Sequence, residues 1–212
     1  MKKFELTSEF ITNIFGTKLF RIKALIEFGN VKAGELGGFT EKEENLSQDG
    51  NAWVYDNARV YGDACVCGDA CVCGDARVHG NARVCGDACV YDNARVYGDA
   101  CVYGDARVCD NARVYGNAWV YGDACVCGDA CVYGDACVYG DAGYATVHGF
   151  GSEYRTTTFF KTKAGDIGVK CGCFYGNLSE FRKKVVETHG ETKKAKEYLM
   201  LADLMEFRLT HK

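Results

Sequence analysis

The chain has 212 residues, 48% hydrophobic content and a formal net charge of -4, which predicts one folded unit with appended pieces and excludes a disordered polypeptide. No stretch approaches the roughly 18 consecutive apolar residues that a membrane span needs. The start, MKKFELTSEF, has no apolar run long enough for a secretory signal. We therefore expect a cytoplasmic protein that does not bind a membrane.

Acidic and basic side chains are unevenly distributed along the chain. Residues 50–142 carry 13 acidic and 6 basic side chains, whereas residues 143–212 carry 8 acidic and 12 basic ones. Binding to nucleic acid depends on Lys and Arg contacts with phosphates. The acidic middle therefore makes nucleic acid an unexpected partner, although a basic C-terminal piece that touches nucleic acid remains the alternative.

Residues 1–49 are predicted to form an N-terminal β cap and an irregular first coil. Short apolar runs such as residues 19–22 and 24–26 alternate with glycines at 16, 29, 34, 37 and 38, which favours strands and turns. Leu36 lies 18 residues before Val54, so we expect this segment to lead into an irregular first coil.

Residues 50–150 are predicted to form a hexapeptide-repeat β-helix. From Gly50 the chain repeats six residues without insertion, as in GNAWVY, DNARVY and GDACVY, with Val at every sixth position from Val54 to Val138. A period of six fits neither a helix nor a long strand, so each hexad is a short strand followed by a corner. Ala and Val point inward and the neighbours of Val outward. Gly, Asp and Asn suit the corners.

A second period, of 18 residues, predicts that the coil has three sides. Asp replaces Gly at the first corner position only at Asp56, Asp92 and Asp110, which are separated by multiples of 18. One outward column, also 18 residues apart, reads Arg59, Arg77, Arg95 and Arg113, followed by Cys131. The open strand edges at both ends of such a prism need covering.

Residues 151–212 are predicted to form a small ββαα cap. Residues 156–160 and 167–174 have the composition of strands. Asn177 and Glu180 fit a capping box, and Gly190 fits a helix stop. The predicted buried faces of the two helices are Phe181, Val185 and Val186, then Tyr198, Leu201, Ala202, Met205 and Leu209.

The V-x-G-D/N-A-x unit, seen for example with Val54 and Ala58, is similar to the left-handed β-helix hexapeptide family. This resemblance implies a left-handed coil. Residues 30–39, 45–47 and 50–54 also resemble the lead-in of uncharacterised bacterial and phage proteins often labelled acyltransferases, and the likeness covers about residues 25–150. Residues 169–174 look like an extension met in phage-type relatives.

The resemblance implies a CoA-dependent acyltransferase with a histidine base in a site shared by the subunits of a trimer. His79 is a weak candidate for that base, because it stands in a column of tyrosines at 61, 97, 115 and 133 and is expected to replace one of them on a solvent face. His148, where the repeat ends, is weaker still. No loop interrupts the coils to form a pocket. We therefore favour a non-catalytic structural or interaction protein, with the acyltransferase and its homo-oligomer as the alternative.

The predicted binding residues are Arg59, Arg77, Arg95 and Arg113 with Tyr61, Tyr97 and Tyr115. Guanidinium groups pair with carboxylates and phosphates and pack on aromatic rings, so this surface suits a macromolecular partner, which we expect to be a protein. The alternative is that corner residues Asp63 and Asp99 neutralise the arginines.

Fourteen cysteines, twelve of them within the repeats, do not predict a disulfide framework, because the cytosol keeps thiols reduced. Two groups would cluster on adjacent coils: Cys71, Cys73 and Cys89, then Cys109, Cys125 and Cys127. Three thiols do not close a zinc site. We therefore predict neither a metal nor a cofactor.

Overall fold

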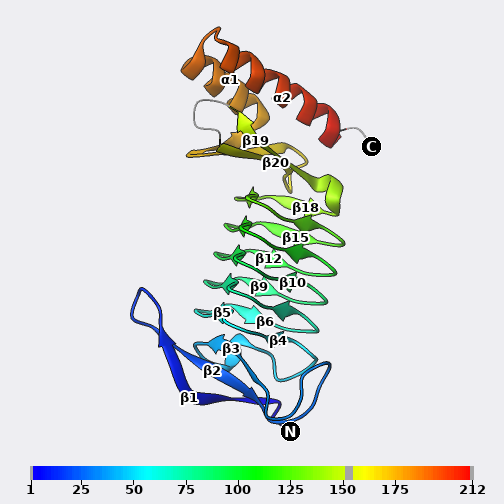
Figure 1. The fold of residues 1–212 in the computed structure, drawn as a ribbon. Coiled ribbons are helices and arrows are strands. Elements are labelled where there is room, and N and C mark those ends of the chain that lie inside the picture. Colours follow the sequence, from blue (N-terminus) through cyan, green and yellow to red (C-terminus); the bar gives the residue numbers. More distant parts are fainter. Residues whose placement is uncertain (1, 151–154, 211–212) are drawn as a thin grey trace.

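The computed structural model describes residues 2–150 and 155–210. The chain climbs from a β cap at the N-terminal end, through a stack of coils, to a sheet and two helices at the other end (Figure 1). Residues 151–154 and 211–212 of the predicted C-terminal cap lie outside the described residues.

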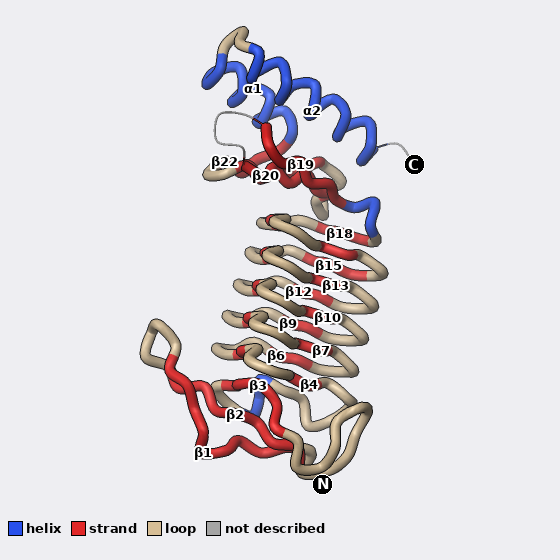
Figure 2. The backbone as a smooth tube through the Cα atoms, in the orientation of Figure 1, coloured by secondary structure: helices blue, strands red, loops and turns tan. Residues whose placement is uncertain are grey.

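The central coil is a three-sided parallel β-solenoid, as predicted, with one short strand on each side of every turn (Figure 2). The first side holds β5 (Arg59–Val60), β8 (Arg77–Val78), β11 (Arg95–Val96), β14 (Arg113–Val114) and β17 (Cys131–Val132). The second holds β4 (Trp53–Val54), β7 (Cys71–Val72), β10 (Cys89–Val90), β13 (Arg107–Val108) and β16 (Cys125–Val126). The third holds β6 (Cys65–Val66), β9 (Arg83–Val84), β12 (Cys101–Val102), β15 (Trp119–Tyr121) and β18 (Cys137–Tyr139). The left-handed sense of the coil stays a prediction from the resemblance.

The interior of the coil is filled by the Val and Ala of every hexad. Each Val from Val54 to Val138 is fully buried, and the Ala two residues before it is at most 1% exposed. Burial of one valine side chain contributes roughly 1.5 kcal/mol or more. Neighbouring turns are joined by backbone bonds such as Arg77 N to Ala94 O, at 2.9 Å. The predicted pattern of inward Val and Ala is confirmed.

The N-terminal cap consists of β1 (Phe4–Thr12), β2 (Lys18–Ala24), β3 (Leu36–Thr40) and the short 3-10 helix η1 (Glu43–Asn45). β1 pairs antiparallel with β2, and β2 pairs antiparallel with β3. β3 then pairs in parallel with β5, so the cap extends the first side of the coil. Thr40, rather than Leu36, is in register with a coil valine, and Leu36 is 54% exposed. The 18-residue spacing from Leu36 to Val54 is therefore not the register in which this strand pairs with the coil.

Two side chains show how the cap covers the lower edge of the coil. Lys3 is buried, and its Nζ donates to the carbonyls of Gly50 and Ala52, at 3.2 and 3.1 Å. Burial lowers the pKa of Lys3 to about 8. Trp53, placed outward by the repeat pattern, is instead fully buried beneath the rings of Phe4 and Phe28. The pattern fails there because a segment distant in sequence covers that face.

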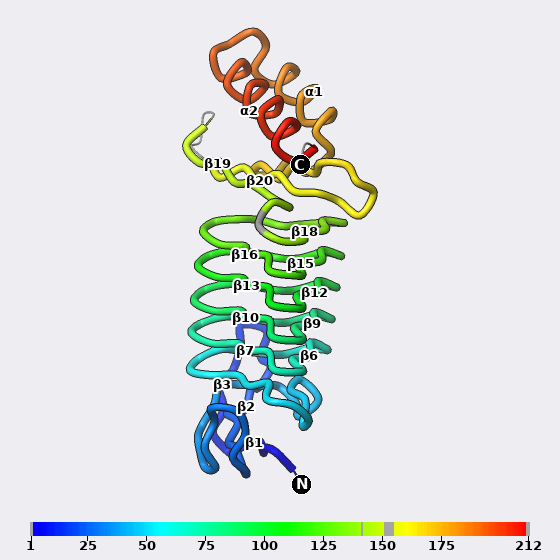
Figure 3. Tube along the Cα trace, turned by 90° about the vertical axis from the view of Figure 1, so that its right-hand side faces the viewer, coloured from blue at the N-terminus to red at the C-terminus, as the bar shows by residue number. Residues whose placement is uncertain are grey.

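The C-terminal cap begins after the short 3-10 helix η2 (Asp141–Gly143). It has an antiparallel sheet of β19 (Tyr144–Phe150), β20 (Arg155–Lys161), β21 (Ile167–Cys171) and β22 (Phe174–Asn177). The two strands predicted in this cap are therefore among four strands of one sheet. The sheet begins at Tyr144, before the predicted boundary at residue 150. Helices α1 (Leu178–His189) and α2 (Lys193–Thr210) pack beyond this sheet, on its side away from the coil (Figure 3).

The predicted capping box of α1 is confirmed. The Asn177 side chain accepts a bond from Glu180 N, and the Glu180 carboxylate accepts one from Asn177 N, both at 2.8 Å. Gly190 ends the helix. Val185 is buried as predicted, but Val186 is 52% exposed, which corrects the predicted face. Neither described helix has an apolar stretch long enough to cross a lipid bilayer.

The sheet of the C-terminal cap covers the upper edge of the coil. Cys131 N donates to Thr158 Oγ1 and Lys163 N donates to the carbonyl of Asp135, both at 3.0 Å. Phe160 from β20 is fully buried and continues the core of the coil. Both ends of the solenoid are therefore covered, as the exposed strand edges require.

Candidate functional site

The predicted arginine column forms on the first side of the coil. Arg77 is in direct register with Arg59 below it and with Arg95 above it, and Arg95 is in register with Arg113. Neighbouring parallel strands lie about 4.8 Å apart. Arg95 and Arg113 are exposed, whereas Arg59 and Arg77 are half-buried. The fold therefore holds four guanidinium groups in one line.

An aromatic column runs beside the arginine column. His79 stacks between Tyr61 and Tyr97, at centroid distances of 4.7 and 5.0 Å with planes within 9° of parallel. Tyr97 stacks on Tyr115 at 4.7 Å, and Tyr115 contacts the tilted ring of Tyr133 at 4.4 Å. Below we call the two columns together the arginine–tyrosine face: Arg59, Arg77, Arg95 and Arg113 with Tyr61, His79, Tyr97, Tyr115 and Tyr133.

The phenols of Tyr61 and Tyr97 stay protonated at neutral pH. Burial raises the pKa of Tyr61 against the opposing effect of Arg77, Arg59 and Arg95. Burial also raises the pKa of Tyr97. These hydroxyl groups can therefore donate hydrogen bonds to an incoming acceptor, next to guanidinium groups that donate several more.

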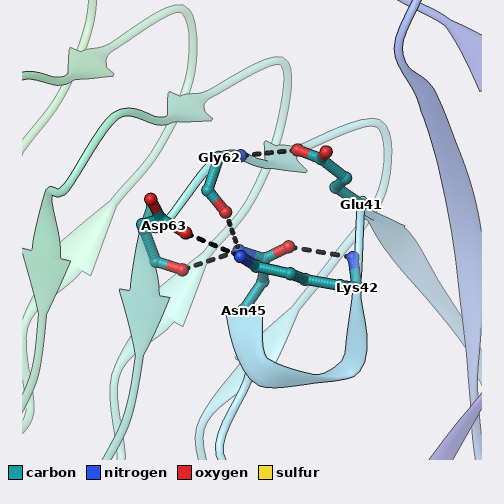
Figure 4. Close-up of polar contacts among 6 residues, drawn as sticks. Glu41, Lys42, Asn45, Gly62 and Asp63 are labelled. Carbon is teal, nitrogen blue, oxygen red and sulfur yellow. Dashed lines mark hydrogen bonds and ion pairs between the residues drawn. The ribbon is translucent and has the colours of Figure 1, made fainter.

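The corner aspartates do not pair with the arginine column. Asp63 accepts a bond from Lys42 Nζ at 2.7 Å, in a cluster where Glu41 and Asn45 bind the backbone of Gly62 (Figure 4). Asp99 accepts a bond from the Asn81 amide at 2.8 Å. Neither aspartate makes an ion pair with an arginine of the column.

Within residues 2–150 and 155–210, none of the four arginines of the column makes an ion pair. Like charges held in register repel one another, by an amount that salt and water reduce. The four arginines lie on a solvated surface, and no carboxylate among the described residues forms an ion pair with them. An external group that carries negative charge would relieve the repulsion.

His79 lies where predicted, replacing a tyrosine within the aromatic column. Burial lowers its pKa, and the charges of Arg77 and Arg95 lower it further, so the imidazole is neutral at pH 7. In the described part of the chain its ring nitrogens make no hydrogen bond to an orienting carboxylate. A neutral imidazole can act as a base, but this geometry lacks the supporting acid that usually orients one.

The arginine column ends where the C-terminal cap begins. Cys131 takes the place of an arginine in the last turn, and there the cap brings Arg155 and Lys170 to the same side. Neither Arg155 nor Lys170 was predicted from the sequence, because the repeat pattern does not indicate where the cap sheet docks on the coil. The only signals were the break in the column at Cys131 and the basic charge of the C-terminal piece.

The cysteines differ from expectation in one respect. Cys67 and Cys85, 18 residues apart on adjacent turns, form a disulfide, whereas the sequence predicted no disulfide framework. On another side, a hydrogen bond from Cys71 lowers the pKa of Cys73. In the part of the chain that the structure describes, no three His, Cys, Asp or Glu side chains are arranged to hold a metal ion.

Comparison with known proteins supports the architecture. Three segments, residues 52–68, 88–104 and 106–122, match the family model described as "YdcK Beta solenoid repeat". The chain is also similar to "Uncharacterized acetyltransferase YdcK" of Escherichia coli (strain K12), with 40% identity over 63 residues that cover 26% of this chain and 19% of the relative. The match thus spans about a fifth of that curated relative's length.

All three matched segments lie within the coil. They contain Arg59, Arg95 and Arg113 with the tyrosines beside them, whereas His79 falls in the unmatched stretch between the first two segments. The likeness therefore covers most of the predicted binding residues but not the catalytic candidate.

Proposed function

We propose that the protein is a non-catalytic interaction protein whose arginine–tyrosine face binds an acidic protein partner. The observation that carries this proposal is the line of four in-register arginines without a carboxylate partner among the described residues. Arg forms charge-assisted, often bidentate bonds with carboxylates, and the half-buried tyrosines beside the arginines add contact area at low entropic cost. The end caps keep the coil from polymerising, so the face is free to meet a different molecule.

An acidic polypeptide suits this surface better than nucleic acid does. The four arginines lie on a coil segment that carries 13 acidic and 6 basic side chains in total. A duplex, with its dense phosphate charge, would meet the acidic corners on either side of the column, because phosphate contacts dominate nucleic-acid affinity. A polypeptide can place a few carboxylates against the arginines alone.

The test is affinity capture from a lysate of the source organism with two matched double variants. Arg77→Glu with Arg95→Glu reverses two charges of the column, and Arg83→Glu with Arg107→Glu makes the same charge change on the other two sides. We expect the first variant to lose acidic protein partners that the wild type and the second variant retain. Equal retention by both variants contradicts the proposal, and retention of nucleic acid alone would change the partner class.

A second candidate function is a CoA-dependent acetyltransferase. It rests on the name of the Escherichia coli relative, which matches part of this chain. The neutral His79 would be its base. Turnover of acetyl-CoA with amine and sugar acceptors, abolished by His79→Ala, would favour this candidate. Light scattering offers a further discriminator, because acyltransferases of this fold build their site across a threefold assembly, so a monomer counts against it.

A further inference from the structure

We propose that Cys71 and Cys89 form a thiol–disulfide exchange site, at which a low-molecular-weight disulfide joins the two thiols into a bridge between adjacent turns of the coil. Cys71 lies on β7 and Cys89 on β10, the next strand of the second side, and the two residues are in direct register. Cys71 N also donates to the carbonyl of Ala88 at 2.9 Å. The backbone of the coil therefore holds the two cysteines side by side.

The spacing of the two cysteines suits a disulfide. Neighbouring parallel strands lie about 4.8 Å apart, and bridged cysteines have Cα atoms about 4.4–6.8 Å apart. On the third side, Cys67 and Cys85 are 18 residues apart, their Cα atoms are separated by 4.7 Å, and they form a disulfide. Cys71 and Cys89 have the same sequence separation. The register that permits one bridge therefore brings the backbone of the other pair within the range for a second.

The two thiols are free in the structure, and each makes a weak bond elsewhere. Cys71 donates to the Cys73 sulfur, and Cys89 Sγ donates to the carbonyl of Asp87, 3.7 Å away. A cysteine side chain changes rotamer by rotation about one single bond, so both sulfurs can turn toward each other. Cys71, Cys73 and Cys89 are all half-buried, so a small reagent can reach them.

Cys73 supplies a base for the reaction. The hydrogen bond from Cys71 lowers the pKa of Cys73, and the same bond raises the pKa of Cys71. Negative charge at this site therefore resides first on the Cys73 sulfur. Because the thiolate is the attacking species in disulfide exchange, Cys73 can take the Cys71 proton as the Cys71 sulfur attacks a reagent.

The exchange balances in atoms and electrons. The Cys71 sulfur attacks one sulfur of the reagent R–S–S–R, its proton passes to the Cys73 thiolate, and R–S⁻ leaves. The Cys89 sulfur then attacks the Cys71 sulfur of this mixed disulfide, and its proton passes to the first R–S⁻. A second R–S⁻ leaves and takes the proton from Cys73. Cys71 and Cys89 are thereby oxidised to a disulfide, and the reagent is reduced to two molecules of R–SH.

This inference does not rest on the proposed function, because the arginine–tyrosine face lies on the first side of the coil. The test is incubation of the full-length protein with bis(2-hydroxyethyl) disulfide, alkylation of the remaining thiols and mass spectrometry of tryptic peptides. The disulfide already present joins two of these peptides, residues 60–77 and 84–95. We expect the reagent to add a second bridge between them, which Cys71→Ala or Cys89→Ala abolishes.

Cys101→Ala is the matched control, because Cys101 is also a half-buried free thiol but has Arg83 and Trp119 as its in-register neighbours. It should form the second bridge as the wild type does. Cys73→Ala should slow the bridge about tenfold without abolishing it, since it removes the base. Circular dichroism confirms that each variant is folded. Absence of the second bridge in the wild type, its persistence in Cys89→Ala, its loss in Cys101→Ala or an unchanged rate in Cys73→Ala would overturn the inference.

Discussion

The imidazole of His79 lies face to face with the phenol ring of Tyr97, with centroids 5.0 Å apart and planes 7° from parallel. The contact continues through the column of tyrosines on either side, so His79 is one member of a continuous aromatic stack. Burial of His79 within the stack disfavours its protonation, and the charges of Arg77 and Arg95 in the adjacent column disfavour it further.

Titration of His79 follows from that environment. We expect its pKa, followed by NMR of the ring protons, to lie below the ordinary value of 6.5, and Arg77→Gln to raise it. Because the folded state binds the proton less readily than the unfolded state, His79 should lower stability as pH falls below 6.5 through its folded pKa. A pKa at or above 6.5, or one that Arg77→Gln does not change, would contradict the geometry.

The corner at Asp92 offers a stability test. Asp92 has a φ of 58°, in the left-handed region where most other corners of the coil carry glycine. In the described structure its carboxylate makes no hydrogen bond, so Asp92→Gly should stabilise the protein by about 1 kcal/mol in urea denaturation. Asp110→Gly is the matched control, because Asp110 accepts a bond from Gly128 N at 2.9 Å and should gain less. A lower urea midpoint for Asp92→Gly than for the wild type would refute this account of the corners.

Thiol reactivity should differ between Cys73 and Cys125, which lie on the second side of the coil. The hydrogen bond from Cys71 lowers the pKa of Cys73, whereas burial raises the pKa of Cys125 to about 11. Alkylation by iodoacetamide near pH 8, followed by mass spectrometry, should therefore label Cys73 before Cys125, because the thiolate is the nucleophile. Cys71→Ala should slow the labelling of Cys73. Faster labelling of Cys125, or no effect of Cys71→Ala, would count against the assigned bond.

The coil could be predicted from the sequence because its interior repeats without exception. Val96 and Ala94 are fully buried as the period requires, and Arg95 lies in register with Arg77 as the 18-residue spacing requires. Each of these relationships depends on backbone geometry that is the same in every turn. The columns that form the candidate face were therefore predictable.

The parts that could not be predicted depend on contacts between segments with no common period. Trp53 occupies an outward position, yet the N-terminal cap buries it. Asp63 lies beside the arginine column but pairs with Lys42, from a turn outside the repeat. Lys170 lies at the end of the column only because the cap sheet docks on the last turn through β20. Such placements follow from tertiary packing.

The arginine column is tested most directly by titrating the protein with a fluorescent poly-glutamate peptide at low and at physiological salt. We predict binding that weakens with salt, and that Arg77→Glu with Arg95→Glu reduces about tenfold or more. The same charge change in Arg83→Glu with Arg107→Glu should have little effect. Equal losses in both double variants, or no binding by the wild type, would contradict a partner-binding role for this face.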